Sequence, residues 1–280
     1  MSLKTILNKS IIKYLILAFG IAWTFWIPAC LLVFYKIIAP TSIIFIAFQS
    51  LGAIAPTIAA IYIFKKYQKE DTRSIFRKYL PQKAPLSLYF LALFLLPLLT
   101  LITIFVSVRV GIIAYPISQN TPFGEIVNDV GILGIIALLP LMVLAYIPSS
   151  PLLEELGWRG FLLPELQKKH NNLLGGIILG LIWGTWHLPL VLSYGDNLLT
   201  FYILIVLHTL IGVWLFVKTS KSLFIAILYH ASLNVALVNF HAGISEWIFV
   251  FTTSTIFVLL LIKDWKLFNN IVIKIEHGKQ

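Results

Sequence analysis

The strongest constraint on this chain is a series of apolar runs, each about as long as a lipid bilayer is thick. A helix rises about 1.5 Å per residue and needs about 20 residues to cross a hydrocarbon core of about 30 Å. The sequence therefore predicts an all-α, polytopic transmembrane helix bundle. The runs lie at 14–35, 42–64, 86–108, 131–152 (continuing past 160), 173–193, 200–217, 222–240 and 247–262.

The composition supports lipid as the surroundings of most of the chain. Hydrophobic residues make up 59% of the 280 residues and charged residues 11%, whereas soluble proteins carry about 25% charged residues. This balance excludes a secreted disulfide scaffold, a disordered tail and a soluble nucleic-acid-binding protein. We expect an integral multi-pass membrane protein, in the cell membrane if the source is a prokaryote, with membrane lipid as a partner and no nucleic acid.

The number of spans depends on the fourth run, because 131–167 is too long for one straight span. Pro140, Pro148 and Pro151 allow either one bent span or two spans separated by a break. With one span, 18 of the 21 Lys and Arg residues fall on one side of the membrane. With two, the split is ten against ten. Cytoplasmic loops carry an excess of Lys and Arg, so we predict about eight spans with both termini in the cytoplasm.

The chain divides by its motifs rather than by any linker. Residues 1–130 form the first three predicted spans, 131–262 form spans four to eight with all the recognisable motifs, and 263–280 form a cytoplasmic tail. The basic segment 65–85 is interpreted as a loop that contacts lipid headgroups, in preference to a binding site for nucleic acid or a protein partner.

Ionisable residues inside the predicted spans call for an explanation, because each costs about 2.5–3.5 kcal/mol on insertion scales. They occur in four places: 154–159 (EELGWR), 183–187 (WGTWH), His208 and 230–234 (HASLN). His208 has no polar companion one turn away, and we expect it to bind a backbone carbonyl within the bundle.

Helical spacing separates the two carboxylates by role. Glu155 and Arg159 are i, i+4 neighbours and are expected to form an ion pair. Glu154 is turned about 100° away and has no cation at i+3 or i+4, so it is the better candidate for proton transfer. His230 and Asn234 are also i, i+4 neighbours and share one helix face.

Three glycines at four-residue spacing, Gly176, Gly180 and Gly184, predict a face on which another helix packs closely. His187 lies on nearly the same face as Gly180, which favours a histidine that points into the bundle. The tryptophans of these motifs, Trp158, Trp183 and Trp186, are interpreted as packing or interface residues.

The three ordered motifs resemble those of the CPBP family of CAAX proteases and bacteriocin-processing enzymes, also called the Abi family, which includes the Rce1 prenyl-protein proteases. EExxxR is matched by Glu154, Glu155 and Arg159, and HxxxN by His230 and Asn234. FxxxH is matched at 183–187 with Trp in place of Phe, which keeps an aromatic ring one turn before the histidine. The resemblance covers roughly 130–240.

The resemblance implies an intramembrane endopeptidase that hydrolyses membrane-associated peptides or proteins, in CAAX-type or leader-peptide processing. Glu154 and His187 would activate the attacking water, and His230 and Asn234 would stabilise the oxyanion. Glu155 and Arg159 would hold the carboxylates in place. The substrate would be a prenylated peptide, a bacteriocin or pheromone precursor, or another membrane protein.

The family is often described as metalloproteases, and Glu154, His187 and His230 would make a zinc set with one open position. Because the HExxH signature is absent, and because the better-understood members look metal-independent, we expect no obligatory metal. Two other classes remain open: a non-catalytic bacteriocin-immunity or scaffold protein, and a proton-coupled transporter. The central prediction is that the four catalytic candidates meet in one water-filled pocket that opens toward the cytosol.

Overall fold

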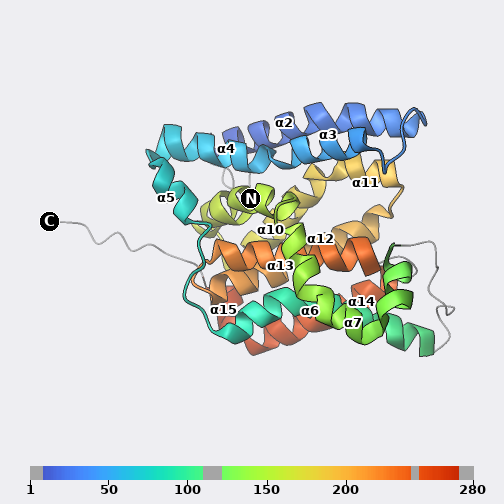
Figure 1. Ribbon diagram of the computed structural model, residues 1–280. Coiled ribbons are helices and arrows are strands. Elements are labelled where there is room, and N and C mark those ends of the chain that lie inside the picture. The colour runs from blue at the N-terminus through green and yellow to red at the C-terminus, as the bar shows by residue number, and fades with distance from the viewer. Residues whose placement is uncertain (1–8, 110–121, 241–245, 271–280) are drawn as a thin grey trace.

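The computed structural model describes residues 9–109, 122–240 and 246–270, and over these ranges it is helical and contains no strand. Figure 1 shows α2, α3 and α4 side by side at the top, α12 and α13 in the middle, and α6, α7 and α14 below them. The helices are α2 (Lys9–Phe34), α3 (Ile43–Ala53), α4 (Ala55–Ile63), η1 (Phe64–Gln68), α5 (Thr72–Arg77), α6 (Leu86–Arg109), α7 (Pro122–Tyr146), α8 (Ser150–Gly157), η2 (Trp158–Leu162), α9 (Leu163–Gln167), α10 (Asn172–Trp186), α11 (Leu188–Tyr194), α12 (Leu198–Lys218), α13 (Leu223–Phe240), α14 (Glu246–Lys263) and α15 (Trp265–Asn269).

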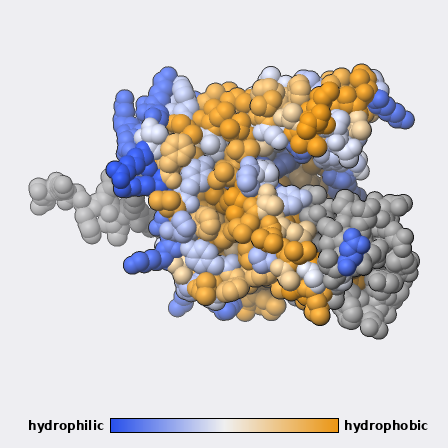
Figure 2. Space-filling model, viewed as in Figure 1, coloured by the Kyte–Doolittle hydropathy of each residue, from blue (hydrophilic) through white to orange (hydrophobic). Residues whose placement is uncertain are grey.

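The predicted all-α membrane bundle is confirmed. Within the described ranges, four helical segments can cross a membrane by length and apolar composition, and six can if each of two bent helix pairs counts as one span. The seventh and eighth predicted spans correspond to shorter apolar helices, Leu223–Leu237 and Trp247–Lys263, so the total of eight stays a prediction. Apolar residues cover the middle of the face in Figure 2, and hydrophilic residues gather at the end where α5 lies.

The two bent pairs are the spans that carry the EExxxR and WxxxH motifs. The chain bends by 59° between Leu133–Tyr146 and Ser150–Gln167, and by 58° between Asn172–Trp186 and Leu188–Tyr194. Prolines explain both bends, because each lacks a backbone N–H and crowds the carbonyl four residues earlier. Pro151 lies in the first turn of α8 and Pro189 in the first turn of α11. His187 is the residue between α10 and α11.

The basic connections lie together at one end of the bundle. Lys78, Lys168 and Lys221, from three separate connections, line one cavity. Lys218 Nζ lies 2.6 Å from Asp264 Oδ1, which places the start of α15 at the same end. This is the arrangement expected if the long fourth run is a single bent span, since a second span there would move Lys168 to the opposite end. The cytoplasmic orientation of this end stays a prediction.

Helix α8, which carries both carboxylates, is enclosed between α4 on one side and α13 on the other. The contact with the N-terminal helices is close: a Cβ on Gly157 would lie 2.5 Å from Pro56 Cβ and 2.5 Å from Tyr14 Oη. The Tyr14 ring also packs 4.8 Å from the Phe161 ring, centroid to centroid. The first two spans, which supply α2, α3 and α4, therefore form one wall around α8.

The glycine face of α10 packs against α12, as its spacing predicts. Cβ atoms on Gly176, Gly180 and Gly184 would meet Leu210, Val206 and Tyr202, all on α12, at 2.7–2.9 Å. At Gly180 the nearest atom is the Cα of Val206, which belongs to the backbone and cannot move by a rotamer change. The seam therefore depends on the absence of a side chain at Gly180.

We predict that Gly180→Ala lowers the free energy of unfolding by about 1–3 kcal/mol, because the new methyl group must push α10 and α12 apart. The control is Gly20→Ala in α2, where a Cβ would meet nothing within 4 Å and the better helix propensity of Ala makes the change neutral or stabilising. Thermal unfolding of both variants in detergent micelles checks this. Equal melting temperatures would contradict the close approach of α10 and α12.

Candidate functional site

The two carboxylates of the EExxxR motif lie at the end of α8, directly before a π-helical turn, η2. Glu154 is 2% exposed and Glu155 is 0% exposed. A π-helical turn widens the helix by one residue and is frequent at functional sites. The two carboxylates of the motif therefore lie in an α-helix, α8, whereas Arg159 lies in the π-helical turn that follows it.

Glu155 forms the centre of a buried ion network. Its Oε1 atom accepts a hydrogen bond from Arg159 Nη1 at 2.6 Å and another from His230 Nδ1 at 2.8 Å. The i, i+4 ion pair expected from the sequence is therefore formed. The contact with His230, which comes from α13, adds a tie between two spans. A buried carboxylate of this kind depends on its partners, because desolvation leaves an isolated charge unstable.

Glu154 is held by two indole groups. Its Oε2 atom accepts hydrogen bonds from Trp158 Nε1 at 3.2 Å and from Trp183 Nε1 at 2.9 Å. Its other oxygen, Oε1, has no hydrogen-bond partner among the described residues. The two donors fix the direction of the carboxylate and leave one oxygen available.

His187 is oriented by a backbone carbonyl in the last turn of α10. Its Nδ1 lies 2.9 Å from the Trp183 carbonyl oxygen. A carbonyl only accepts, so Nδ1 carries the proton and Nε2 presents a lone pair when the ring is neutral. The ring packs 4.7 Å from Trp186 and 5.9 Å from Trp26 of α2, and it remains partly exposed. Nε2 has no partner within the described ranges.

His230 and Asn234 share a face of α13 that looks toward α8. The Nδ1 atom of His230 is occupied by Glu155, whereas Nε2 makes no hydrogen bond to any described residue. The side-chain amide of Asn234 donates to Ser150 Oγ at 3.0 Å. An amide nitrogen has two N–H groups, so the second remains free to donate.

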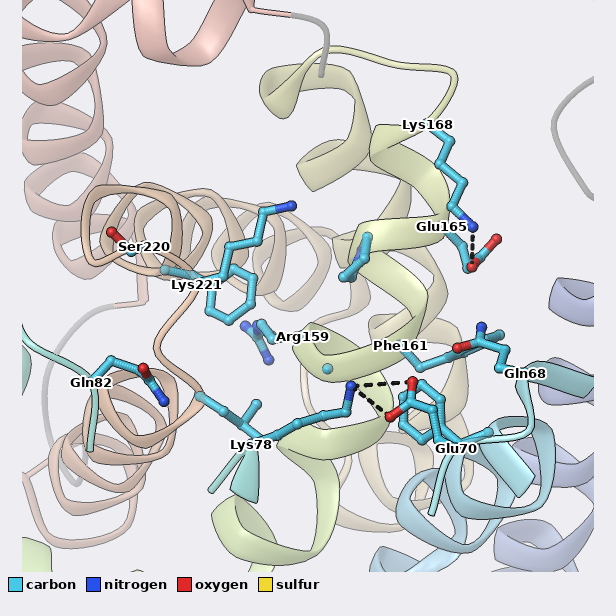
Figure 3. A pocket seen from close by; sticks show the side chains of 15 residues that line it. Gln68, Glu70, Lys78, Gln82, Arg159, Phe161, Glu165, Lys168, Ser220 and Lys221 are labelled. Carbon is cyan, nitrogen blue, oxygen red and sulfur yellow. Dashed lines mark hydrogen bonds and ion pairs between the residues drawn. The ribbon is translucent and has the colours of Figure 1, made fainter. Parts of the chain in front are cut away.

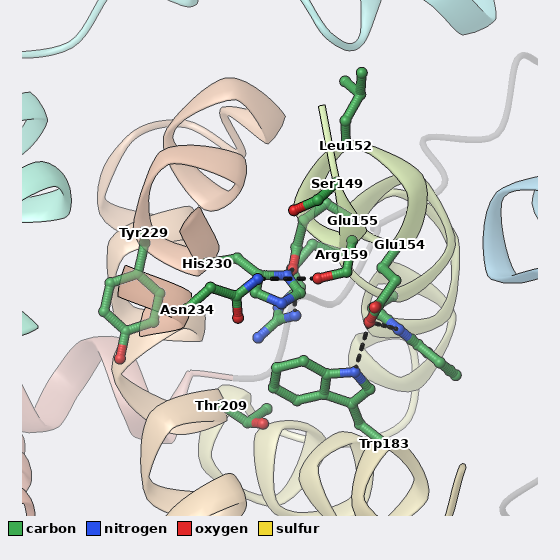
Figure 4. A network of polar contacts seen from close by, with 12 residues as sticks. Ser149, Leu152, Glu154, Glu155, Arg159, Trp183, Thr209, Tyr229, His230 and Asn234 are labelled. Carbon is green, nitrogen blue, oxygen red and sulfur yellow. Dashed lines mark hydrogen bonds and ion pairs between the residues drawn. The ribbon is translucent and has the colours of Figure 1, made fainter. Parts of the chain in front are cut away.

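Trp183 brings the candidates together. Its ring centroid lies 5.4 Å from that of His187 and 5.1 Å from that of His230, and Arg159 Cζ lies 4.9 Å away. Figure 4 shows the indole pointing at Glu154 on one side, with His230 and Asn234 facing α8 on the other. Three of the four predicted catalytic residues, Glu154, His187 and His230, therefore contact one aromatic side chain. Among the described residues, no hydrogen bond joins any two of the four directly.

The sequence alone missed the roles of the tryptophans and of Ser150. We predicted Trp158 and Trp183 as packing residues, yet both donate to Glu154. Trp158 stands at i+4 from Glu154, the same spacing that indicated the Glu155–Arg159 pair. The hydrogen bond between Trp158 and Glu154 could therefore have been predicted from the sequence. The Trp183 contact spans 29 positions, and no local pattern predicts it.

The prediction for His208 was wrong. Its side chain is 2% exposed, and neither ring nitrogen has a hydrogen-bond partner in the part of the chain described. The nearby Ile205 carbonyl is taken by the hydroxyl of Thr209 at 2.6 Å. The His208 ring instead lies 5.7 Å from the Phe249 ring of α14, centroid to centroid. An apolar neighbour supplies no acceptor for an imidazole N–H.

The zinc set considered from the sequence does not fit this geometry. Across residues 9–109, 122–240 and 246–270, no three His, Cys, Asp or Glu side chains are arranged so that they could hold a metal ion. Glu154, His187 and His230 all contact Trp183, which binds Glu154 through Nε1 and packs its ring against both imidazoles.

Comparison with known proteins gives two matches. A family model described as type II CAAX prenyl endopeptidase Rce1-like matches residues 136–236. A protein named CAAX prenyl protease 2 from Methanococcus maripaludis is 32% identical over 93 residues, which cover 29% of this chain and 34% of that protein. The match thus spans about a third of the relative's length. The matched family segment contains all three motifs of the site.

The matches and the apolar helices both indicate that the site lies in a membrane protein. Several helices are long and apolar enough to cross a membrane, and the matched family model is described as a type II CAAX prenyl endopeptidase. The chain is an integral, multi-pass membrane protein. Its segment 136–236, which holds Glu154, His187, His230 and Asn234, is similar to the Rce1-like type II CAAX prenyl endopeptidase family.

Proposed function

We propose that this protein is an intramembrane endopeptidase that hydrolyses a peptide bond with a water molecule activated by Glu154 and His187. One observation carries the proposal. Glu154, His187 and His230 each have one polar atom fixed by the protein and a second, Oε1 or Nε2, without a partner among the described residues. Fixed groups with one open position are what positioned acid–base catalysis requires.

The open atoms of Glu154 and His187 are both acceptors. A water molecule that donates one hydrogen to Glu154 Oε1 and the other to His187 Nε2 would direct its lone pair at the substrate carbonyl carbon. As the C–O bond forms, the water proton passes to Glu154. Glu154 then returns that proton to the amine nitrogen of the leaving peptide as the C–N bond breaks, so protons and charge balance.

The unbound N–H groups on α13 suit hydrogen-bond donation, whereas the open atoms of Glu154 and His187 accept hydrogen bonds. The free N–H of Asn234, and Nε2–H of His230 in its doubly protonated form, would donate to the oxyanion of the tetrahedral intermediate. Donors that are already fixed cost little reorganisation when charge develops. Ser150 and Glu155 supply that fixation, through hydrogen bonds of 3.0 Å to Asn234 and 2.8 Å to His230.

The substrate class is proposed from the match to the CAAX prenyl protease 2 of Methanococcus maripaludis. We propose a membrane-associated peptide or protein, with a prenylated C-terminal peptide as the first substrate to assay. Because the site lies among helices that can cross a membrane, a substrate with a lipid anchor or an apolar segment would reach it from the bilayer.

We predict that Glu154→Gln reduces cleavage of a prenylated test peptide by at least about 10³-fold, because the amide cannot accept the water proton. The matched control is Glu165→Gln. Glu165 is also buried, at 7% exposed, but pairs with Lys168 outside the site, and its variant should retain activity. Thermal unfolding establishes that both variants are folded. A folded Glu154→Gln protein with undiminished cleavage would refute the proposed role and favour a non-catalytic or transport function.

We further propose that hydrolysis needs no metal. Cleavage in membranes should therefore persist after prolonged treatment with a strong zinc chelator. The same treatment of a soluble zinc peptidase in the same reaction serves as the positive control for metal removal. Complete loss of cleavage that added zinc restores would contradict this part of the proposal.

A further inference from the structure

A cavity of about 580 Å³ lies at the basic end of the bundle, separate from the four catalytic candidates. Its walls come from η1, the η1–α5 and α5–α6 connections, the η2–α9 segment and the α12–α13 turn. This volume falls in the range of small-molecule sites, about 300–1,000 Å³. Glu154, His187, His230 and Asn234 are not among the residues that line it.

The cavity has an excess of positive charge. Four cationic side chains line it, Lys78, Arg159, Lys168 and Lys221, against the two carboxylates of Glu70 and Glu165. Lys78 lies 3.0 Å from Glu70, and Lys168 lies 2.5 Å from Glu165, so these two cations are compensated inside the cavity. Arg159 is paired with Glu155, which lies outside the cavity, at 2.6 Å. The uncompensated positive charge of the cavity therefore comes from Lys221.

Arg159 has donors to spare. It uses Nη1 for the ion pair with Glu155, whereas Nε and Nη2 make no hydrogen bond to the described residues. The side chain is only 2% exposed, and a buried donor without a partner costs free energy. An anion in the cavity would relieve that cost. Figure 3 shows the Arg159 guanidinium between Lys221 and Lys78, at the centre of the view.

Lys221 is held at the cavity by an unusual turn. Ser220 and Lys221 both have positive φ, at 54° and 66°. Residues other than glycine adopt this left-handed region only at a cost in free energy. Here two such residues follow one another in the short turn between α12 and α13. Lys221 is exposed and makes no ion pair within the described ranges. The turn thus presents an uncompensated cation to the cavity.

We propose that this cavity binds a phosphate group, supplied by an anionic phospholipid headgroup or by free phosphate. Guanidinium and ammonium groups that approach from different walls suit a tetrahedral anion with several acceptor oxygens. Basic pockets between membrane helices near the bilayer surface bind phosphate-bearing headgroups. The amides of Gln68 and Gln82 and the hydroxyl of Ser220 line the same cavity and supply further donors. This inference does not rest on proteolytic activity.

The test measures thermal unfolding of the full-length protein in a neutral detergent as lipid is added. A ligand that binds the folded state raises the melting temperature with its concentration. Dioleoylphosphatidylglycerol should stabilise the protein, whereas dioleoylphosphatidylcholine at equal concentration should not. A second arm adds inorganic phosphate alone: a rise there assigns the site to free phosphate, and a rise with phosphatidylglycerol only assigns it to a headgroup.

The decisive variant is Lys221→Asn, because asparagine tolerates positive φ and the change removes only the cation. We expect about a fivefold higher ligand concentration for half of the stabilisation, the value of one Lys–phosphate contact near a membrane surface. Lys266→Asn is the control, since Lys266 is exposed on α15 but does not line the cavity.

Lys221→Gly serves as a second variant, because glycine relieves the strain of the turn and guards against a folding defect. The proposal is overturned if neither phosphatidylglycerol nor phosphate stabilises the protein. It is equally overturned if both lipids stabilise the protein to the same extent, or if both Lys221 variants respond as the parent and the Lys266 variant do.

Discussion

The arrangement of the site depends on one buried carboxylate. Glu155 is fully buried and binds Arg159 of its own helical segment and His230 of α13 through a single oxygen. Removing one partner of such a group leaves a charge without compensation in a medium that solvates it poorly. The network therefore fixes α8, η2 and α13 relative to one another. Glu154 and Asn234 take their positions from the helices that it joins.

Helix breaks supply the remaining geometry. The bends before α8 and after α10 occur at prolines in the middle of apolar spans, where a broken helix leaves carbonyls unsatisfied. At the second break two side chains donate to backbone carbonyls near the end of α10. His187 donates to the Trp183 carbonyl at 2.9 Å, and Trp23 of α2 donates to the Trp186 carbonyl at 2.9 Å. The break thus orients a catalytic candidate and ties it to the first span.

The sequence predicted those features that depend on the spacing of residues along one helix. Apolar run length predicted the helices, and four-residue spacing predicted the Glu155–Arg159 pair. The glycine repeat predicted a close contact with another helix, which the structure identifies as α12. Contacts between spans were not predictable in this way. The indole of Trp183 reaches Glu154 from another helix, and the unpaired nitrogens of His208 reflect a neighbour, Phe249, far along the chain. Such partners depend on how different helices pack against one another, and the spacing of residues within one sequence does not reveal that packing.

The most direct test of this account is a double-mutant cycle between Glu155 and His230, read as the free energy of unfolding in micelles. For Glu155→Gln combined with His230→Gln, contact between the side chains predicts a coupling of about 1–3 kcal/mol. The parallel cycle of Glu155→Gln with His208→Gln should be additive within about 0.5 kcal/mol, because His208 has no hydrogen-bond partner among the described residues. Additive effects in the Glu155–His230 cycle would contradict the shared buried network on which the site is built.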